Sequence, residues 1–268
     1  MTETTETPLL VTREGPVVRA TFNRPARRNA LNAALSAAID TLLAELREDR
    51  AARILVLSGA GGHFCAGLDL TEVGAESGTP EQRLAAQLER NRRIGERFAA
   101  LSALPQVVIA AVQGAAHAGG LGFVCAADIA FATADARFAA PEVRRGLTPA
   151  QILPWLVRRM GRSAATRLVL QAGILTAADA ARLGLVHDIA PDAAALTALV
   201  DATTADILQG APGALAETKA LLAALGPVSP PGYAEAGAAS FARCASGTEA
   251  AEGIAAFKEK RAPRWALK

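Results

Sequence analysis

Aromatic side chains are scarce in this chain of 268 residues, where they make up 4% of the sequence beside a hydrophobic content of 51%. The core must therefore be built mainly from alanine, leucine and valine. Proteins that recognise RNA usually stack bases on aromatic side chains, and no platform of aromatic and basic residues is visible here. The charge is also nearly balanced, with 28 Lys and Arg against 26 Asp and Glu. We therefore expect no nucleic-acid partner.

Cysteine and long apolar runs are lacking too. The cysteines Cys65, Cys125 and Cys244 lie far apart without metal-ligand spacing, so we expect a reduced, cytoplasmic protein without a metal site. No run of about 18 apolar residues occurs, and no membrane span is expected. The N-terminal segment has neither the basic nor the apolar region of a signal peptide. A length of 268 residues fits one domain, alone or with an appendage.

Glycine, in contrast, is concentrated in one informative stretch. Val107–Val112 is an apolar run that predicts a buried strand, and four glycines follow between positions 114 and 122. Leu121–Ala127 then predicts a short helix and Asp128–Thr133 a second strand, before a loop that reaches Glu142. N–H groups at a helix start suit a negative oxygen, and a carboxylate that returned to that point could serve as a base. For the glycines alone, a buried crossover with tight helix–strand packing remains the alternative.

A second stretch, Ile54–Leu70, has the same order of strand, glycine turn and the segment FCAGLDL. Together the two stretches resemble the crotonase superfamily, the enoyl-CoA hydratases and isomerases. The first signature of that family ends in A-G-x-D, here Ala66-Gly67-Leu68-Asp69, and its second reads about A-V-x-G-x-A-x-G-G-G, here AVQGAAHAGG. A third signature, F-x-x-P-E-x-x-x-G, matches the segment from Phe138 to Gly146. These motifs in this order are specific for the superfamily but not for the reaction.

The resemblance implies an α/β fold of the crotonase (ClpP-like) type, a spiral of ββα repeats with a C-terminal helical trimerisation region. On this basis residues 1–190 form the core with the acyl-CoA site, and residues 191–268 form a helical oligomerisation region. Because relatives assemble as trimers, a homotrimer, or a hexamer made of two trimers, is expected. Periodicity alone indicates only an α/β protein with a single core.

For the chemistry, the resemblance implies an enzyme that acts on an acyl-CoA thioester, with coenzyme A as part of the substrate and no other cofactor. Leu68 and Gly119 match the residues whose backbone N–H groups hold the thioester oxygen, and Glu142 matches the acid/base. The other positions expected to contact the substrate or coenzyme A are Arg27, Ala66, Gly67, Asp69, Gly120, His117, Phe257 and Lys260.

Several of these positions have an ordinary structural alternative. Arg27 lies in a turn that can simply be solvated, and Lys260 lies in a basic C-terminal segment. Asp69 is expected to cap or orient its turn. His117 stands where relatives carry a small or apolar residue, and packing or a backbone hydrogen bond explains it as well as substrate contact does.

The main departure from the family is Gly122, where hydratases carry a glutamate that handles the water together with a second glutamate, here Glu142. One carboxylate suffices to shift a double bond, so an enoyl-CoA isomerase is the alternative to a hydratase that acts on an unusual or branched enoyl-CoA. We expect slow hydration of crotonyl-CoA, and faster hydration after Gly122→Glu if the pocket has room. A CoA- or RNA-binding protein with little catalysis is the alternative of another class, and the presence of Glu142 argues against it.

Overall fold

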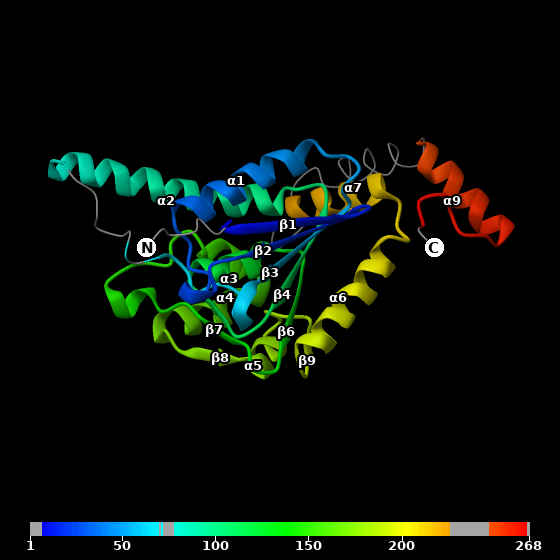
Figure 1. The fold of residues 1–268 in the computed structure, drawn as a ribbon. Coiled ribbons are helices and arrows are strands. Elements are labelled where there is room, and N and C mark those ends of the chain that lie inside the picture. The colour runs from blue at the N-terminus through cyan, green and yellow to red at the C-terminus, as the bar shows by residue number, and fades with distance from the viewer. Residues whose placement is uncertain (1–6, 70, 72–77, 226–246, 267–268) are drawn as a thin grey trace.

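Two sheets organise the computed structural model, which describes residues 7–69, 71, 78–225 and 247–266 (Figure 1). The larger sheet has six strands in the order β1-β2-β3-β4-β6-β9, and the smaller has three in the order β5-β7-β8. The strands are β1 (Leu9–Glu14), β2 (Val17–Phe22), β3 (Ile54–Gly59), β4 (Val107–Val112), β5 (Ala115–His117), β6 (Ile129–Thr133), β7 (Arg137–Ala139), β8 (Ile174–Thr176) and β9 (Asp188–Ala190). Beyond the antiparallel β1–β2 hairpin, all pairs in the larger sheet are parallel. The central strand β4 is buried along its whole length, as its unbroken apolar sequence predicts.

Helices connect these strands. They are α1 (Ala33–Glu48), α2 (Pro80–Ser102), α3 (Gly119–Ala126), α4 (Leu153–Gln171), α5 (Ala177–Arg182), α6 (Ala193–Ile207), α7 (Pro212–Ala224) and α9 (Thr248–Glu259). Short 3-10 turns, η1 (Pro25–Arg27), η2 (Ala60–Gly62) and η3 (Glu142–Arg145), lie in the connections. In Figure 1, α1 and α2 cross the top of the view, whereas α6 lies beside β6 and β9.

Helix α3 begins two residues earlier than the sequence predicts, at Gly119 instead of Leu121. Glycine is a poor helix former, so the pattern assigns Gly119 and Gly120 to the turn. The fold places both in the first helical turn because Gly120 packs directly on the backbone of the first glycine turn. A Cβ at Gly120 would lie 2.2 Å from the carbonyl oxygen of Cys65. Gly119 is thus the first residue of α3, and its N–H donates no hydrogen bond to any described residue.

The larger sheet separates two apolar cores. Leu55 and Leu57 of β3 belong to a large cluster with side chains of α1, α2, α3 and α4. Ile54 and Val56 point to the other face, where they join a smaller cluster with side chains of α6. Helix α6 thus packs against the sheet of its own chain. The assignment of residues 191–268 to an oligomerisation region stays a prediction.

Four of the phenylalanine side chains form one cluster. Phe22 contacts Phe64 and Phe123 at ring-centroid distances of 5.4 Å and 5.3 Å, and Phe98 contacts Phe123 at 5.1 Å. All are almost completely buried. Tilted and edge-to-face ring contacts of this kind add stability beyond simple burial. This phenylalanine cluster joins β2, α2 and α3 to the turn after β3, and it supports the site described below.

The remaining expectations concern cysteines and membrane spans. Cys65 and Cys125 are buried free thiols, and burial raises the pKa of each thiol to about 12. Both are therefore unreactive at neutral pH. Cys244 lies outside the described residues. Among the residues that the structure describes, no helix is long and apolar enough to cross a membrane.

Candidate active site

Two glycine turns, one after β3 and one after β5, touch each other. The first runs beside β5, where the N–H of Cys65 donates to the carbonyl oxygen of Ala115 (2.9 Å) and the N–H of His117 donates to that of Cys65 (2.9 Å). At Gly67, φ is 93°, and an added Cβ would lie 2.8 Å from the Cβ of Ala118 and 3.5 Å from the nitrogen of Gly119. Only glycine meets both requirements, the positive φ and the close approach.

The contact brings two free N–H groups together. The N–H of Leu31 donates to the Gly67 carbonyl (2.7 Å), and the N–H of Asp69 donates to the Leu31 carbonyl (3.0 Å). In such a bridge the N–H of the intervening Leu68 points away from Leu31. Within the described part of the chain, the N–H groups of Leu68 and Gly119 donate no hydrogen bond. This arrangement is suited to hold an oxygen that gains negative charge.

Ala118 sets the direction of the second donor. It adopts φ 50° and ψ −118°, a conformation that residues with a Cβ rarely take. Its N–H donates to the carbonyl of Ala139 (2.9 Å), and its carbonyl accepts from the N–H of Gly122 (3.0 Å). The family signature has glycine here, so the alanine stands at a strained position. The sequence analysis missed this role, although the departure from the signature was visible.

Asp69 stabilises the first turn. Its Oδ2 accepts from Nη2 of Arg24 (2.9 Å), and its Oδ1 accepts from the hydroxyl of Thr71 (2.7 Å). The Thr71 hydroxyl and the Arg24 guanidinium hold the pKa of this carboxyl below its usual value, against the effect of burial. With both oxygens bonded inside the protein, Asp69 is arranged for orienting the turn, the role that its position predicts.

Asn29 and Arg24 form a clamp beneath the same turn, which the sequence analysis did not identify. The buried Asn29 side chain donates to the carbonyl oxygens of Ala60 (2.9 Å) and His63 (2.6 Å), and accepts from the N–H of Arg24 (2.8 Å). Arg24 also donates to the carbonyl of Ala30. A buried amide with these partners fixes the backbone that carries Leu68. The only sequence signal was a lone Asn between Arg28 and Ala30.

Glu142 is the first residue of η3 and lies half-buried. Its Oε2 is fully shielded from solvent and has no partner among the described residues. Burial raises the pKa of this carboxyl above its ordinary value, although a backbone hydrogen bond and the charge of Arg145 oppose the shift. A carboxyl group with a raised pKa is better able to hold a proton and to pass it to a substrate.

His117 ends β5 and pairs in parallel register with Ala139 of β7. Its Nε2 is also shielded from solvent without a partner among the described residues. Burial lowers the pKa of this imidazole, and the nearby charges of Arg145, Arg28 and His63 lower it further. At neutral pH the ring is therefore uncharged and can accept a proton.

Gly122 lies one turn along α3 from Gly119, and neighbouring side chains fill the space that a side chain at this position would occupy. An added Cβ would lie 2.4 Å from Cζ of Phe98 and 2.7 Å from Cγ2 of Ile152. Both side chains are almost completely buried. The room that Gly122→Glu requires is therefore absent in this structure, because an aromatic ring from α2 fills it.

Of the other predicted positions, some lie at the first glycine turn and some at the C-terminal helix α9. Ala66 donates its N–H to the Arg28 carbonyl (3.0 Å), which places it and the exposed turn with Arg27 beside the first glycine turn. Gly120 is buried against Cys65, so its packing role is evident. Lys260 is exposed and directly follows α9, which lies apart from α3 in the same chain (Figure 1). The side chain of Phe257 lies outside what the structure describes.

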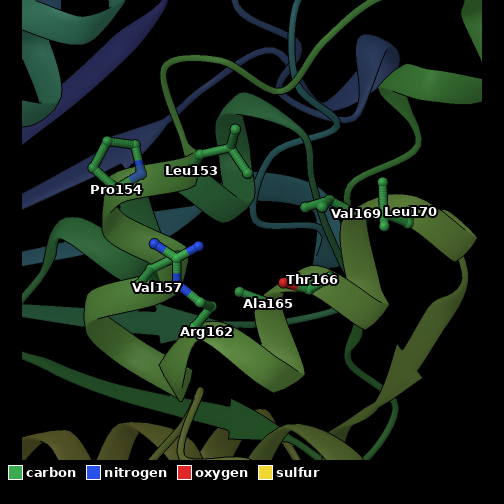
Figure 2. Close-up of a pocket in the computed structure, with 8 residues that line it drawn as sticks. All are labelled: Leu153, Pro154, Val157, Arg162, Ala165, Thr166, Val169 and Leu170. Carbon is green, nitrogen blue, oxygen red and sulfur yellow. The ribbon is translucent and has the colours of Figure 1, made fainter.

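A separate groove lies on the surface of α4, where Gly161 breaks the helix with φ 77° (Figure 2). It has a volume of about 490 Å³ and is lined mainly by apolar side chains, with Arg162 and Thr166 as its polar members. It offers no acid or base that could move a proton, so its features do not compete with the turn site as a reaction centre.

Comparison with known proteins gives consistent results. The sequence model described as enoyl-CoA hydratase/isomerase matches residues 12–268. A 2,3-dehydroadipyl-CoA hydratase of Escherichia coli is 34% identical over 260 residues, which cover 95% of this chain and 97% of that protein. A mevalonyl-coenzyme A hydratase of Aspergillus fumigatus is 31% identical over 255 residues, covering 93% and 91%.

Solved structures agree with these matches. An enoyl-CoA hydratase/isomerase from Marinobacter aquaeolei superimposes with a TM-score of 0.90 at 37% identity, covering 97% of this chain and 99% of the other. AtuE from Pseudomonas aeruginosa superimposes with a TM-score of 0.91 at 41% identity, covering 97% and 100%.

Proposed function

Because this chain belongs to the enoyl-CoA hydratase/isomerase family, we propose that it hydrates an enoyl-CoA thioester held by the N–H groups of Leu68 and Gly119. Glu142 is the acid/base of the reaction. The enzyme class, the superfamily and the crotonase fold predicted from the motifs are confirmed by the relatives and the structural neighbours. The substrate, the oxyanion hole and the role of Glu142 are the proposal.

The observation that carries the proposal is the contact between the two glycine turns. It supplies two N–H donors on touching backbone segments. Glu142 follows three residues after β7, and its Oε2 has no partner among the described residues. When both donors bind the thioester oxygen, the carbonyl is polarised and negative charge can move onto that oxygen. One such donor is worth about 3–4 kcal/mol in the transition state. Glu142 then exchanges a proton with the carbon next to the carbonyl.

The substrate class follows from the same site. Coenzyme A enters as part of the substrate, with Ala66 and the Arg27 turn beside the first donor, and no other cofactor is required for this chemistry. Hydratase is the commoner name among the relatives. Since Gly122 leaves one carboxylate in place of two, an unusual or branched enoyl chain fits the proposal better than crotonyl-CoA does.

Calorimetry with acetoacetyl-CoA tests binding, and Glu142→Gln tests the chemistry. The wild type and the variant should both bind the ligand, while the variant should lose about 10²–10⁴-fold in turnover of an enoyl-CoA panel. Glu14→Gln, on the β1–β2 hairpin, is the matched control and should keep full activity. No heat at millimolar ligand would remove the acyl-CoA proposal. Turnover by Glu142→Gln close to wild type would place the acid/base elsewhere.

A double-bond isomerase is the second candidate. The filled space at Gly122 favours it, because moving a proton between two carbons needs only one carboxyl group. Products decide between the two reactions: a 3-hydroxyacyl-CoA indicates hydration, and a shifted enoyl-CoA without added oxygen indicates isomerisation.

A homotrimer, or a hexamer of two trimers, completes the proposal. Exposed apolar side chains line the groove of Figure 2, including Leu170, which is 70% exposed, and Val157, which is 39% exposed. Such a patch is typical of a contact surface. Association would also let Phe257 and Lys260 reach the coenzyme A of a neighbouring subunit. A monomer in light scattering at micromolar concentration would contradict this part of the proposal.

A further inference from the structure

Two polar atoms near the donor turns are buried and unpartnered. They are Nε2 of His117 and Oε2 of Glu142, and neither has a hydrogen-bond partner among the residues described. Native proteins rarely leave buried polar atoms in this state, because the lost hydrogen bonds with water are not replaced. Such atoms are usually completed by an ordered water molecule or by a ligand.

The backbone brings these two residues to the same edge of the small sheet. His117 ends β5 opposite Ala139 of the parallel strand β7, and strand neighbours lie about 4.8 Å apart. The N–H of Ala118 donates to the carbonyl of Ala139 (2.9 Å), which ties the two chain segments together just beyond His117. Glu142 follows three residues after Ala139. Arg145 influences the charge state of both side chains, so both lie within its electrostatic reach.

We propose that His117 is the second catalytic residue of the site, and that its Nε2 and Oε2 of Glu142 together hold the water that adds to the enoyl chain. The proposal rests on the function proposed above. It places the partner of Glu142 on the end of β5, next to the Gly119 donor, instead of on α3.

Other groups near the turns are already engaged or excluded. Position 122 is filled by Phe98 and Ile152. The ring of His63 accepts from the N–H of Ala115 through Nδ1 (3.2 Å). Asp69 is bonded to Arg24 and Thr71. His117 is the remaining described residue in this neighbourhood that has both a titratable group and an unpartnered buried atom.

The charged surroundings suit an acid and a base. The groups that act on His117 are Arg145, Arg28 and His63, and all of them disfavour a positive imidazolium ring. The charged group that acts on Glu142 is Arg145, while burial favours the protonated carboxyl group. Burial therefore favours the neutral form of both groups, which is the protonated carboxyl group of Glu142 and the imidazole of His117 with a free lone pair.

Hydration then proceeds with balanced protons. Neutral His117 takes a proton from the water, and the water oxygen bonds to C3 while the C2=C3 electron pair moves toward the thioester oxygen. The N–H groups of Leu68 and Gly119 stabilise that charge. Protonated Glu142 gives its proton to C2, and the carbonyl re-forms. Imidazolium and carboxylate remain, and a proton passes through solvent from the first to the second. Dehydration uses the reverse states with the same total number of protons.

His117→Gln tests the inference, because glutamine keeps a polar amide near the Nε2 position but cannot take a proton. Hydration of crotonyl-CoA and of a branched enoyl-CoA should fall about 10²–10⁴-fold, while acetoacetyl-CoA binding stays within a few fold. In the wild type, kcat should show an acid limb whose midpoint lies below the ordinary histidine value of 6.5. That limb should vanish in the variant, measured from about pH 5 to about pH 8, where histidine titrates.

Deuterium exchange separates the two residues. Butyryl-CoA has no double bond to hydrate, so exchange of its C2 hydrogen with heavy water needs Glu142 and the N–H donors but not His117. His117→Gln should keep this exchange, and Glu142→Gln should lose it. The matched control is His187→Asn, since His187 lies at the start of β9 and accepts from the N–H of Ala130 through Nδ1. This variant should keep both activities.

The outcomes are distinguishable. If the wild type neither binds acetoacetyl-CoA nor exchanges the C2 hydrogen, the proposed function fails. If the wild type does both and His117→Gln hydrates at the wild-type rate, or keeps the acid limb, the inference about His117 is wrong while the proposed function stands. Retained exchange also shows that His117→Gln has folded, so lost hydration cannot come from misfolding.

Discussion

Two groups of side chains, here called the apolar wall and the polar wall, differ in packing and in hydrogen bonding. The apolar wall consists of Gly122, Phe98 and Ile152, where a phenyl ring occupies the position of an absent side chain. The polar wall consists of His117 and Glu142, each with a buried atom that has no hydrogen-bond partner in the part of the chain that the structure describes. Packing is complete on the first wall and hydrogen bonding is incomplete on the second. Under the proposed function, this difference assigns the proton chemistry to the polar wall and none to the apolar wall.

Gly122→Glu attacks the apolar wall and should have the largest effect. The new side chain would collide with Phe98 and Ile152 and would bury a carboxyl group without a partner. We expect a loss of roughly 3–5 kcal/mol in the free energy of unfolding, measured with urea. Hydration of crotonyl-CoA should not increase. A stable variant with faster hydration would show that Phe98 of α2 can move to make room for the new side chain. The description of this space as filled would then be wrong.

A pair of alanine substitutions sharpens the same point. Gly122→Ala should destabilise by about 1–3 kcal/mol, because its Cβ meets a buried ring. Gly95→Ala in α2 is the control, since its Cβ meets only the end of the flexible Gln151 side chain. There alanine should stabilise by about 1 kcal/mol through its higher helix propensity. Equal effects at the two positions would contradict the packing argument.

Glu142→Gln probes the polar wall through stability. Burial raises the pKa of Glu142 above its ordinary value of 4.5, so the folded state binds the proton more tightly than the unfolded state does. The free energy of unfolding of the wild type should therefore fall as pH rises from 4.5 through the raised pKa of the folded state. Above it, the glutamine variant should be more stable by about 1 kcal/mol, and the gain should disappear under more acidic conditions. Urea unfolding at a series of pH values measures this crossover.

His117→Gln should show the opposite pH dependence. Because the pKa of His117 is lowered below 6.5 in the folded state, protonation of this ring destabilises the wild type in acid, and the variant lacks this contribution. The variant should gain relative stability as pH falls through that range. The stability of each variant relative to the wild type is the quantity compared. If it changes in the same direction with pH for both variants, the pKa shifts of His117 and Glu142 are not those described above.

Ala118→Gly changes the residue between His117 and Gly119, and it should have the smallest effect. Glycine accepts φ 50° and ψ −118° without strain, but it also increases the entropy of the unfolded chain. We expect a net gain of about 0.5 kcal/mol in thermal or urea unfolding, with acetoacetyl-CoA binding nearly unchanged. A loss of stability would indicate that the Ala118 methyl group packs in a way that outweighs its strain.

Local sequence patterns predicted the elements that carry the donors. Val107–Val112 was correctly bounded because an unbroken apolar run is typical of a central parallel strand. Gly67 and Gly119 were identified through motifs, and the structure explains the motif chemically by the close contact between the two turns. The start of α3 was misplaced because propensity disfavours glycine, whereas close packing on Cys65 requires it.

Long-range contacts set the limit of the sequence prediction. Phe98 is 24 residues before Gly122 and comes from another helix, so nothing near Gly122 in the sequence reveals that the gap is filled. The clamp of Asn29 and Arg24 depends on a left-handed backbone at Asn29 and on carbonyls from the turn after β3. His117 was named as a contact residue, but the unpartnered state of its Nε2 emerges only when the burial of single atoms is known.

The small sheet that carries His117 and leads to Glu142 has consequences for amide hydrogen exchange. Its strands β5, β7 and β8 have three residues each, whereas β3 and β4 in the larger sheet have six. Few backbone hydrogen bonds must break to free so short a ladder, and subglobal opening is commonest where such bonds are few. We expect the β5 and β7 amides to exchange with solvent through local openings, while those of β3 and β4 exchange only on global unfolding. The strand that ends in His117 and the strand that leads to Glu142 would then open more often than the larger sheet does.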